Sequence, residues 1–166
     1  MNLNEMSGTD GTVVVHRTVA LFAGTFDPFT NGHKSIVDRS LKLFDGVVIA
    51  IGVHPDKRSM MLPEQRLKYI SDVYADEPRV SVMCYEGLTT VLAREIGADV
   101  LVRGVRSVKD FEYERELADV NRSISGIETV LLMSEPQLAS VSSSVVRELM
   151  NYGVDVSQFV PLKFEK

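Results

Sequence analysis

Five nearly continuous apolar runs alternate with amphipathic stretches along this chain, and this alternation constrains the fold more than any other feature of the sequence. A strand with one face in water would alternate polar and apolar residues, so continuous apolar runs suit strands buried on both faces of a parallel sheet. The predicted strands are Thr18–Phe22, Gly46–Gly52, Val80–Tyr85, Val100–Arg103 and Thr129–Met133.

The stretches between these strands have the period of helices that bury one face. The predicted helices are His33–Phe44, Glu64–Tyr74 (preceded by Pro63), Leu88–Ile96, Asp110–Ile124 and Ser143–Tyr152 (followed by Gly153). The apolar stripe of the fourth helix consists of Tyr113, Leu117, Val120 and Ile124. The pattern predicts a doubly wound, Rossmann-like α/β fold, with a five-stranded parallel sheet and helices on both faces. Such sheets bind ligands at the carboxyl ends of their strands, so the loops that follow the strands are the place to look for a site.

Length and charge limit what the chain can be. With 166 residues we expect one domain, over residues 18–166, preceded by a loosely ordered tail of residues 1–17. The net charge of −5 disfavours nucleic-acid binding through a basic surface, so an anionic ligand would need positive charge gathered locally. We expect no signal peptide and no membrane span, since the first residues are polar and no apolar run is long enough. A lone cysteine, Cys84, cannot form an internal disulfide, which fits a cytoplasmic protein.

The loop after the first strand is the most informative segment. Residues 23–33 read Ala-Gly-Thr-Phe-Asp-Pro-Phe-Thr-Asn-Gly-His and lead into the first helix, whose free N–H groups attract phosphate. A Walker loop would need glycine where Pro28 and His33 stand, and no G-x-G-x-x-G fingerprint follows the strand. From the residues alone, Asp27 is interpreted first as a turn former and Thr30 as a helix N-cap.

Four motifs appear in order along the chain. They are G-T-F-D-P at residues 24–28, T-N-G-H at 30–33, R-G-V-R at 103–106 with D-F-E-Y-E at 110–114, and V-S-S-S-x-x-R at 141–147. Together they resemble the phosphopantetheine adenylyltransferase family of the nucleotidyltransferase superfamily, over residues 18–162. Ala23, Thr89 and Leu138 stand where proline, methionine and tryptophan are common in that family.

The resemblance implies a set of site residues. The catalytic residues that it implies are His33, Lys57 and Arg106. For the acceptor it implies Thr25, Lys57, Leu88, Thr89 and Arg103. For ATP it implies Thr25, Phe26, His33, Gly104, Val105, Arg106, Glu114, Leu138, Ala139, Ser140, Val141, Ser142, Ser143 and Ser144. Periodicity alone would make Glu114 a solvated acid, and serines at a helix start could simply cap it.

The activity that the resemblance implies is adenylyl transfer from ATP to 4′-phosphopantetheine, giving dephospho-coenzyme A and pyrophosphate. We expect Mg²⁺ held mainly by ATP phosphates, because the sequence shows no cluster of protein ligands for a fixed metal. The family also implies a homohexamer and feedback binding of coenzyme A. Two alternatives remain: a nucleotidyltransferase with another acceptor, such as nicotinate mononucleotide, and a non-catalytic nucleotide-binding module. The R-G-x-R and F-E-Y-E motifs argue against the first, and the presence of His33, Lys57 and Arg106 argues against the second.

Overall fold

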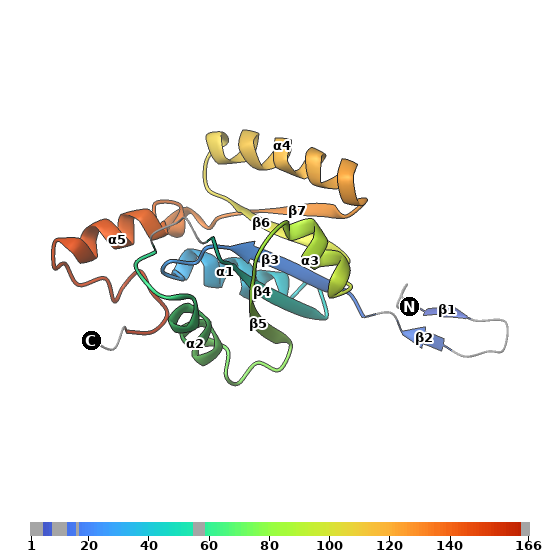
Figure 1. Ribbon diagram of the computed structural model, residues 1–166, viewed down its shortest axis with the longest axis horizontal. Helices are drawn as coiled ribbons and strands as arrows, with labels where there is room; N and C mark the ends of the chain where they lie inside the picture. Colours follow the sequence, from blue (N-terminus) through green and yellow to red (C-terminus); the bar gives the residue numbers. More distant parts are fainter. Residues whose placement is uncertain (1–4, 8–12, 16, 55–58, 164–166) are drawn as a thin grey trace.

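Five strands form one parallel sheet in a computed structural model of the chain, which describes residues 5–7, 13–15, 17–54 and 59–163 (Figure 1). The strand order is β5-β4-β3-β6-β7. The strands are β3 (Val19–Gly24), β4 (Gly46–Gly52), β5 (Val80–Tyr85), β6 (Val100–Val105) and β7 (Glu128–Met133). The predicted α/β fold is therefore confirmed.

Helices cover both faces of this sheet. They are α1 (Asn31–Ser40), α2 (Pro63–Val73), α3 (Thr89–Glu95) and α4 (Val108–Ser125). Successive side chains of a strand point to opposite faces, so Phe22 packs with Ile36 of α1 and Ile70 of α2, whereas Leu21 packs with Leu92 of α3. The helix α4 lies beside α3 and against β6 and β7. The core around the sheet thus consists of two apolar layers, one on each face, and a third cluster surrounds Val146.

The chain changes direction at β3, the central strand. It runs outward through β4 to β5, then crosses back to β6 on the other side of β3 and ends the sheet at β7. Leu21 of β3 consequently has Val48 of β4 on one side and Leu101 of β6 on the other. The loops after β3 and β6 diverge at this switch point and leave a crevice at the carboxyl edge. A fifth helix, α5 (Ser143–Asn151), lies beyond that edge (Figure 1).

Element bounds differ from the prediction where sheet pairing continues past the most apolar residues. Residues 104 and 105, expected in a loop, belong to β6 because Gly104 and Val105 pair with Leu132 and Met133 of β7. The first three residues of the R-G-V-R motif are therefore held by a β-ladder. Helix α1 was expected to end at Phe44 but ends at Ser40, and the residues between these two form a turn.

Two further strands precede the sheet. Strand β1 (Glu5–Ser7) pairs antiparallel with β2 (Val13–Val15), apart from the five-stranded sheet (Figure 1). The division into residues 1–17 and 18–166 stays a prediction.

Candidate active site

A cavity of about 400 Å³ opens at the carboxyl edge of the sheet, at the switch point between β3 and β6. Its walls come from the loop after β3, the first turn of α1, the end of β6, α4 and the first turn of α5. The predicted site residues that line it are Thr25, Phe26, His33, Arg103, Gly104, Arg106, Glu114, Val141, Ser142, Ser143 and Ser144. Segments that are far apart in the sequence therefore converge on one space.

The start of α1 fixes the orientation of the His33 ring. Thr30 is the N-cap, as predicted, and its hydroxyl accepts a bond from the backbone N–H of His33. In return, the backbone N–H of Thr30 donates to Nδ1 of His33 over 3.0 Å, which completes a capping box. A backbone N–H can only donate, so Nδ1 must be the unprotonated nitrogen of the neutral ring. The proton lies on Nε2, which makes His33 a hydrogen-bond donor at the cavity.

His33 stays neutral well below neutral pH. Its ring lies against those of Phe26 and Phe29, with centroids 5.1 Å and 5.5 Å away. Desolvation by this burial, reinforced by the charges of Arg106 and Arg103, lowers the pKa of His33 to about 4. A bound polyphosphate would offset the two arginine charges. In the free protein, however, the ring is a neutral Nε2–H donor at pH 7.

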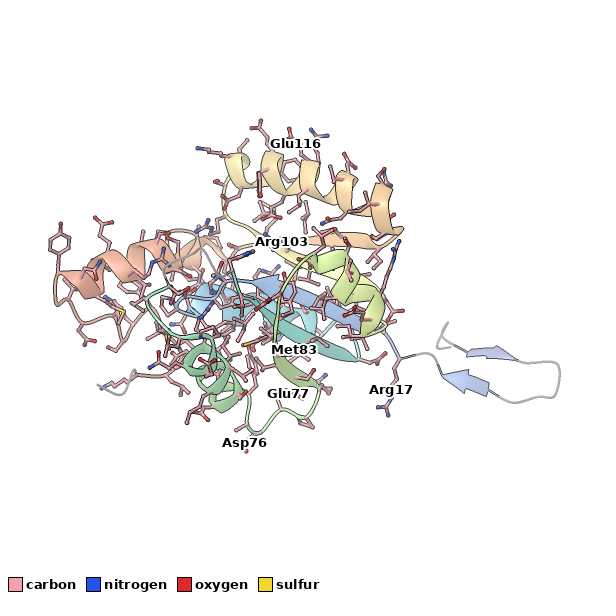
Figure 2. The ribbon with its side chains drawn as sticks, in the orientation of Figure 1. Arg17, Asp76, Glu77, Met83, Arg103 and Glu116 are labelled. Atoms are coloured by element: carbon pink, nitrogen blue, oxygen red, sulfur yellow. The ribbon has the colours of Figure 1, made fainter. Side chains whose placement is uncertain are left out.

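Arg103 is held between the sheet and α4 (Figure 2). Its Nε and Nη2 donate to the two carboxylate oxygens of Glu114, each over 2.7 Å, and its Nη1 donates to the carbonyl of Ala23 over 2.7 Å. Burial alone would lower the pKa of Arg103, but the hydrogen bonds and charge of Glu114 raise it. A guanidinium carries five N–H donors, so this clamp still leaves Arg103 able to donate to a ligand.

Positive potential in the cavity comes from Arg106 and from two helix N-termini. Arg106 is more exposed than Arg103, and its Nε donates to Asp110 over 2.9 Å. Both α1 and α5 begin at the cavity wall, where Gly32 and Ser143 line it. The first N–H groups of a helix and its dipole attract anions. The cavity of this acidic chain is therefore suited to phosphate groups.

The first turn of α5 is fastened to the loop after β3. Ser142 caps the helix by accepting from the N–H of Val145, as its position in the sequence suggested. The Ser143 hydroxyl donates to the carbonyl of Pro28 over 2.8 Å. Arg147 donates to the carbonyl of Asp27 and also to the Ser144 hydroxyl, and it lines the cavity. These bonds set the position of α5 relative to His33.

Arg147 was missing from the predicted site, although it is the final residue of the V-S-S-S-x-x-R motif. Other lining residues were also absent from the predicted site: Phe22, Ala23, Gly24, Asp27, Thr30, Gly32, Ile36 and Ser134. At Gly24 a side chain would have no room, because a Cβ atom there would lie 2.9 Å from the ring of Phe26. The motif spacing could have identified Arg147, but the contribution of Ile36 and Ser134 depends on tertiary packing.

Several predicted site residues do not line the cavity. Val105 is fully buried in the core, and Leu138, Ala139 and Ser140 lie in the turn that leads to α5. After β5, Leu88 is 64% exposed, and the Thr89 hydroxyl bonds to that of Tyr85 over 2.7 Å. Lys57 lies outside the described residues. The loop after β5 is close in the fold to β4 but forms no part of this cavity wall.

The carboxylates at the cavity are already engaged. Glu114 accepts from Arg103, and Asp27 accepts from the backbone N–H groups of Met60 and Met61 over 2.7 Å and 2.9 Å. The Asp27 carboxylate, expected to be a turn former, therefore ties the loop after β3 to the segment that leads into α2. Within the part of the chain that the structure describes, no three His, Cys, Asp or Glu side chains are grouped as a metal site.

Comparison with known proteins agrees with this geometry. The family model for cytidylyltransferase-like proteins matches residues 21–149. A phosphopantetheine adenylyltransferase of Porphyromonas gingivalis is 53% identical over 148 residues, which cover 89% of this chain and 97% of that protein. A protein of the same name from Bacteroides thetaiotaomicron is 50% identical over 142 residues, 86% of this chain and 94% of that one.

A solved structure shares the fold. The bifunctional NMN adenylyltransferase/ADP ribose pyrophosphatase from Francisella tularensis, complexed with AMP and manganese, superposes with a TM-score of 0.67 over 90% of this chain. The chain spans only 46% of that protein and is 14% identical to it, so this likeness concerns the fold alone. The two relatives match at half of their positions or more and along nearly their whole length. On this evidence, the chain belongs to the phosphopantetheine adenylyltransferase family.

Proposed function

We propose that this protein transfers the adenylyl group of ATP to 4′-phosphopantetheine, giving dephospho-coenzyme A and pyrophosphate, a step of coenzyme A biosynthesis. A phosphate oxygen of the acceptor attacks the α-phosphorus of ATP and forms a new P–O bond. The bond from the α-phosphorus to the bridging oxygen breaks, and pyrophosphate leaves with the electron pair. The attacking phosphate is already anionic, so no general base is needed and the protein acts by placement and charge.

The observation that carries this proposal is the fixed, neutral His33 at the switch point. Thr30 occupies Nδ1, so the ring offers only its Nε2–H, and the lowered pKa keeps the ring in this form. We infer that this N–H donates to an α-phosphate oxygen, whose charge changes as the bond to pyrophosphate breaks. The donor is pre-organised, because the capping box and three phenylalanine rings hold it before substrate arrives.

The cationic groups divide between the two substrates. We propose that Arg106 and the N-terminus of α5, with Val141–Ser144, hold the ATP phosphates, together with Arg147. Arg103 and Thr25 are assigned to the phosphate of the acceptor. Lys57 is proposed from its motif position to contact phosphate during transfer. For the pantetheine arm, Leu88 and Thr89 lie after β5, on the β4 side of the switch point.

Mg²⁺ is proposed to arrive with ATP. Asp27 and Glu114 are both engaged, which fits an ion bound by phosphate oxygens and water and not by a protein cage. When bound, Mg²⁺ would offset the negative charge of the polyphosphate. The residues of this chain would then position the α-phosphate and the acceptor.

Assembly as a homohexamer is part of the proposal. Three of the four residues in the α4 stripe, Tyr113, Val120 and Ile124, are 62%, 54% and 52% exposed. Val108 at the start of that helix is 76% exposed. An apolar helix face left in water favours association with another copy. Sedimentation velocity of the purified chain measures the assembly directly.

Two further properties are proposed, one from the chemistry of coenzyme A and one from the cysteine content. Coenzyme A carries both the phosphopantetheine and the adenosine parts, so it should compete with the substrates for the same cavity. A cytoplasmic location is proposed from the lone cysteine, Cys84, which leaves no internal disulfide to form. No helix among the described residues has both the length and the hydropathy to cross a membrane.

Pyrophosphate release tests the activity. Purified protein is incubated with ATP and Mg²⁺, together with 4′-phosphopantetheine, nicotinate mononucleotide or pantetheine without its phosphate. We expect release only with 4′-phosphopantetheine, because unphosphorylated pantetheine has no anionic nucleophile. Release with nicotinate mononucleotide alone would establish the alternative acceptor. ATP binding with no release for any acceptor would indicate a non-catalytic module.

A further inference from the structure

A buried cation lies behind the active-site loop, outside the cavity. Arg66 on α2 is 2% exposed and occupies the same helix face as the buried residues Tyr69 and Ile70. Among the described residues it pairs with no carboxylate, and its Nε has no hydrogen-bond partner. Burying a charge without a counter-charge is costly, and a leucine or methionine would fill such a position more favourably. Arg66 therefore calls for an explanation other than core packing.

The one side-chain hydrogen bond that Arg66 makes to a described residue leads to the site. Its Nη1 donates to the carbonyl oxygen of Thr25 over 2.6 Å, and Thr25 lines the cavity with His33 and Arg103. The nearby thiol of Cys84 supplies no counter-charge, because burial raises its pKa and keeps it protonated at neutral pH. The guanidinium thus holds the main chain of a residue that faces the ligand.

Fastening α2 to this loop does not require Arg66. The Asp27 carboxylate already accepts from the N–H groups of Met60 and Met61, which directly precede α2. These bonds run from α2's leading segment to the loop, whereas the Arg66 bond runs from the helix itself to Thr25. A purely mechanical link would be served by Asp27, while Arg66 adds positive charge at the base of the site.

The position of α2 relates this charge to one substrate. The helix packs on β5 and β4, on the opposite side of β3 from β6. The loop that leads to Thr89, at the start of α3, follows β5, the strand against which α2 packs. The ATP phosphates are assigned to Arg106, Arg147 and the N-terminus of α5, whereas Thr25 is assigned to the acceptor's phosphate. Because Arg66 binds the main chain of Thr25, the buried charge is linked to the acceptor side of the cavity.

We propose that Arg66 is a positioning residue for the attacking phosphate: it fixes the Thr25 main chain, and the acceptor's phosphate supplies a counter-charge that none of the described residues provides. This inference rests on the proposed function. The interaction is electrostatic and indirect, since Arg66 does not line the cavity. It predicts that removing Arg66 harms use of the acceptor more than use of ATP.

Arg66→Met tests the proposal, because methionine fills a similar volume without charge. Steady-state pyrophosphate release is measured with 4′-phosphopantetheine and with ATP varied in turn, and unfolding is followed in parallel. We expect kcat/KM for 4′-phosphopantetheine to fall roughly 10- to 100-fold, as misplacement of a reacting group does, with KM for ATP within about twofold of wild type. The melting temperature should equal or exceed that of wild type, because an uncompensated buried charge has been removed.

The pH dependence of kcat is a further readout, because a purely structural role of Arg66 would leave it unchanged. The second pKa of a phosphate monoester lies at about 6, and a nearby cation favours its dianion. The acid limb of kcat reports groups in the bound complex, so it should move to higher pH in Arg66→Met. Arg66→Lys keeps the charge. It should therefore recover part of the lost kcat/KM for 4′-phosphopantetheine, and its acid limb of kcat should return to the wild-type pH.

Lys68→Met is the matched control. Lys68 is on the same helix, but its side chain is 78% exposed and pairs with Asp72, so its loss should leave all three readouts unchanged. The proposal is overturned if Arg66→Met keeps kcat/KM for the acceptor, or if acceptor use, ATP use and stability fall together. If Arg66→Met does not fold, the test is the acid limb of kcat in the folded Arg66→Lys variant, which should lie at the same pH as in wild type. Wild-type protein inactive with 4′-phosphopantetheine would instead refute the proposed function.

Discussion

Replacing His33 by alanine should lower turnover by roughly 10²- to 10³-fold, the usual effect of losing one pre-organised donor to a reacting oxyanion. The size follows from the structure, because Nδ1 is engaged by Thr30 and Nε2–H is the single donor that the neutral ring can offer. KM for ATP should change little, since Arg106, Arg147 and two helix N-termini still hold the phosphates. The assay is pyrophosphate release at saturating ATP and 4′-phosphopantetheine at pH 7.5.

His33→Gln separates chemistry from folding in this experiment. Alanine also removes the acceptor for the Thr30 N–H, which should cost about 1 kcal/mol of stability. Glutamine at the third helical position completes a capping box, so its stability at pH 7.5 should match wild type. The glutamine amide can donate a hydrogen bond, but from a position displaced from that of the His33 Nε2–H. Turnover should therefore be highest in wild type, lower in His33→Gln and lowest in His33→Ala. A folded alanine variant that retains turnover within about threefold of wild type would remove His33 from the mechanism.

Two further predictions concern stability. Between pH 7.5 and pH 5, urea denaturation should show wild type losing about 2 kcal/mol more than His33→Gln: the unfolded ring binds a proton near pH 6.5 while the folded ring does so only near pH 4, so stability falls as pH falls through this window. Equal losses would contradict the assigned neutral state. Glu114→Ala should cost about 3 kcal/mol, because it leaves Arg103 without its carboxylate, and added pyrophosphate should restore part of this by supplying negative charge. Glu112→Ala, which removes an exposed acid from the same helix, is the control and should leave stability nearly unchanged.

The fold class was predictable because the strands are apolar at nearly every position and the helices have a clear period. The location of the site followed from the same pattern, since carboxyl ends of parallel strands share one edge. The helix start at Thr30 was also local information, as its hydroxyl caps the third N–H beyond it. Such features depend on neighbours within a few residues, which a single sequence displays.

What could not be predicted depends on contacts between distant segments. Helical periodicity makes Glu114 a solvated acid, whereas in the structure it is buried and neutralises Arg103 from another element. Conversely, the apolar stripe with Tyr113 and Val120 is largely exposed, because α4 meets the sheet with a different face. Arg66, a charged residue at a core position, breaks the helical pattern, and nothing in that pattern names Thr25 as its partner.

The convergence of distant segments on the cavity has a consequence for synthesis on the ribosome. The wall begins with Phe22 and is completed by Arg147, so well over a hundred residues of chain must be made and folded between the first and last contributions. A partly synthesised chain would present the loop after β3 without α5 or the end of β6. Nucleotide binding should therefore begin only when β6 and α5 have taken their places at the cavity. Retention of ATP during translation would mark the point at which the nascent chain becomes native.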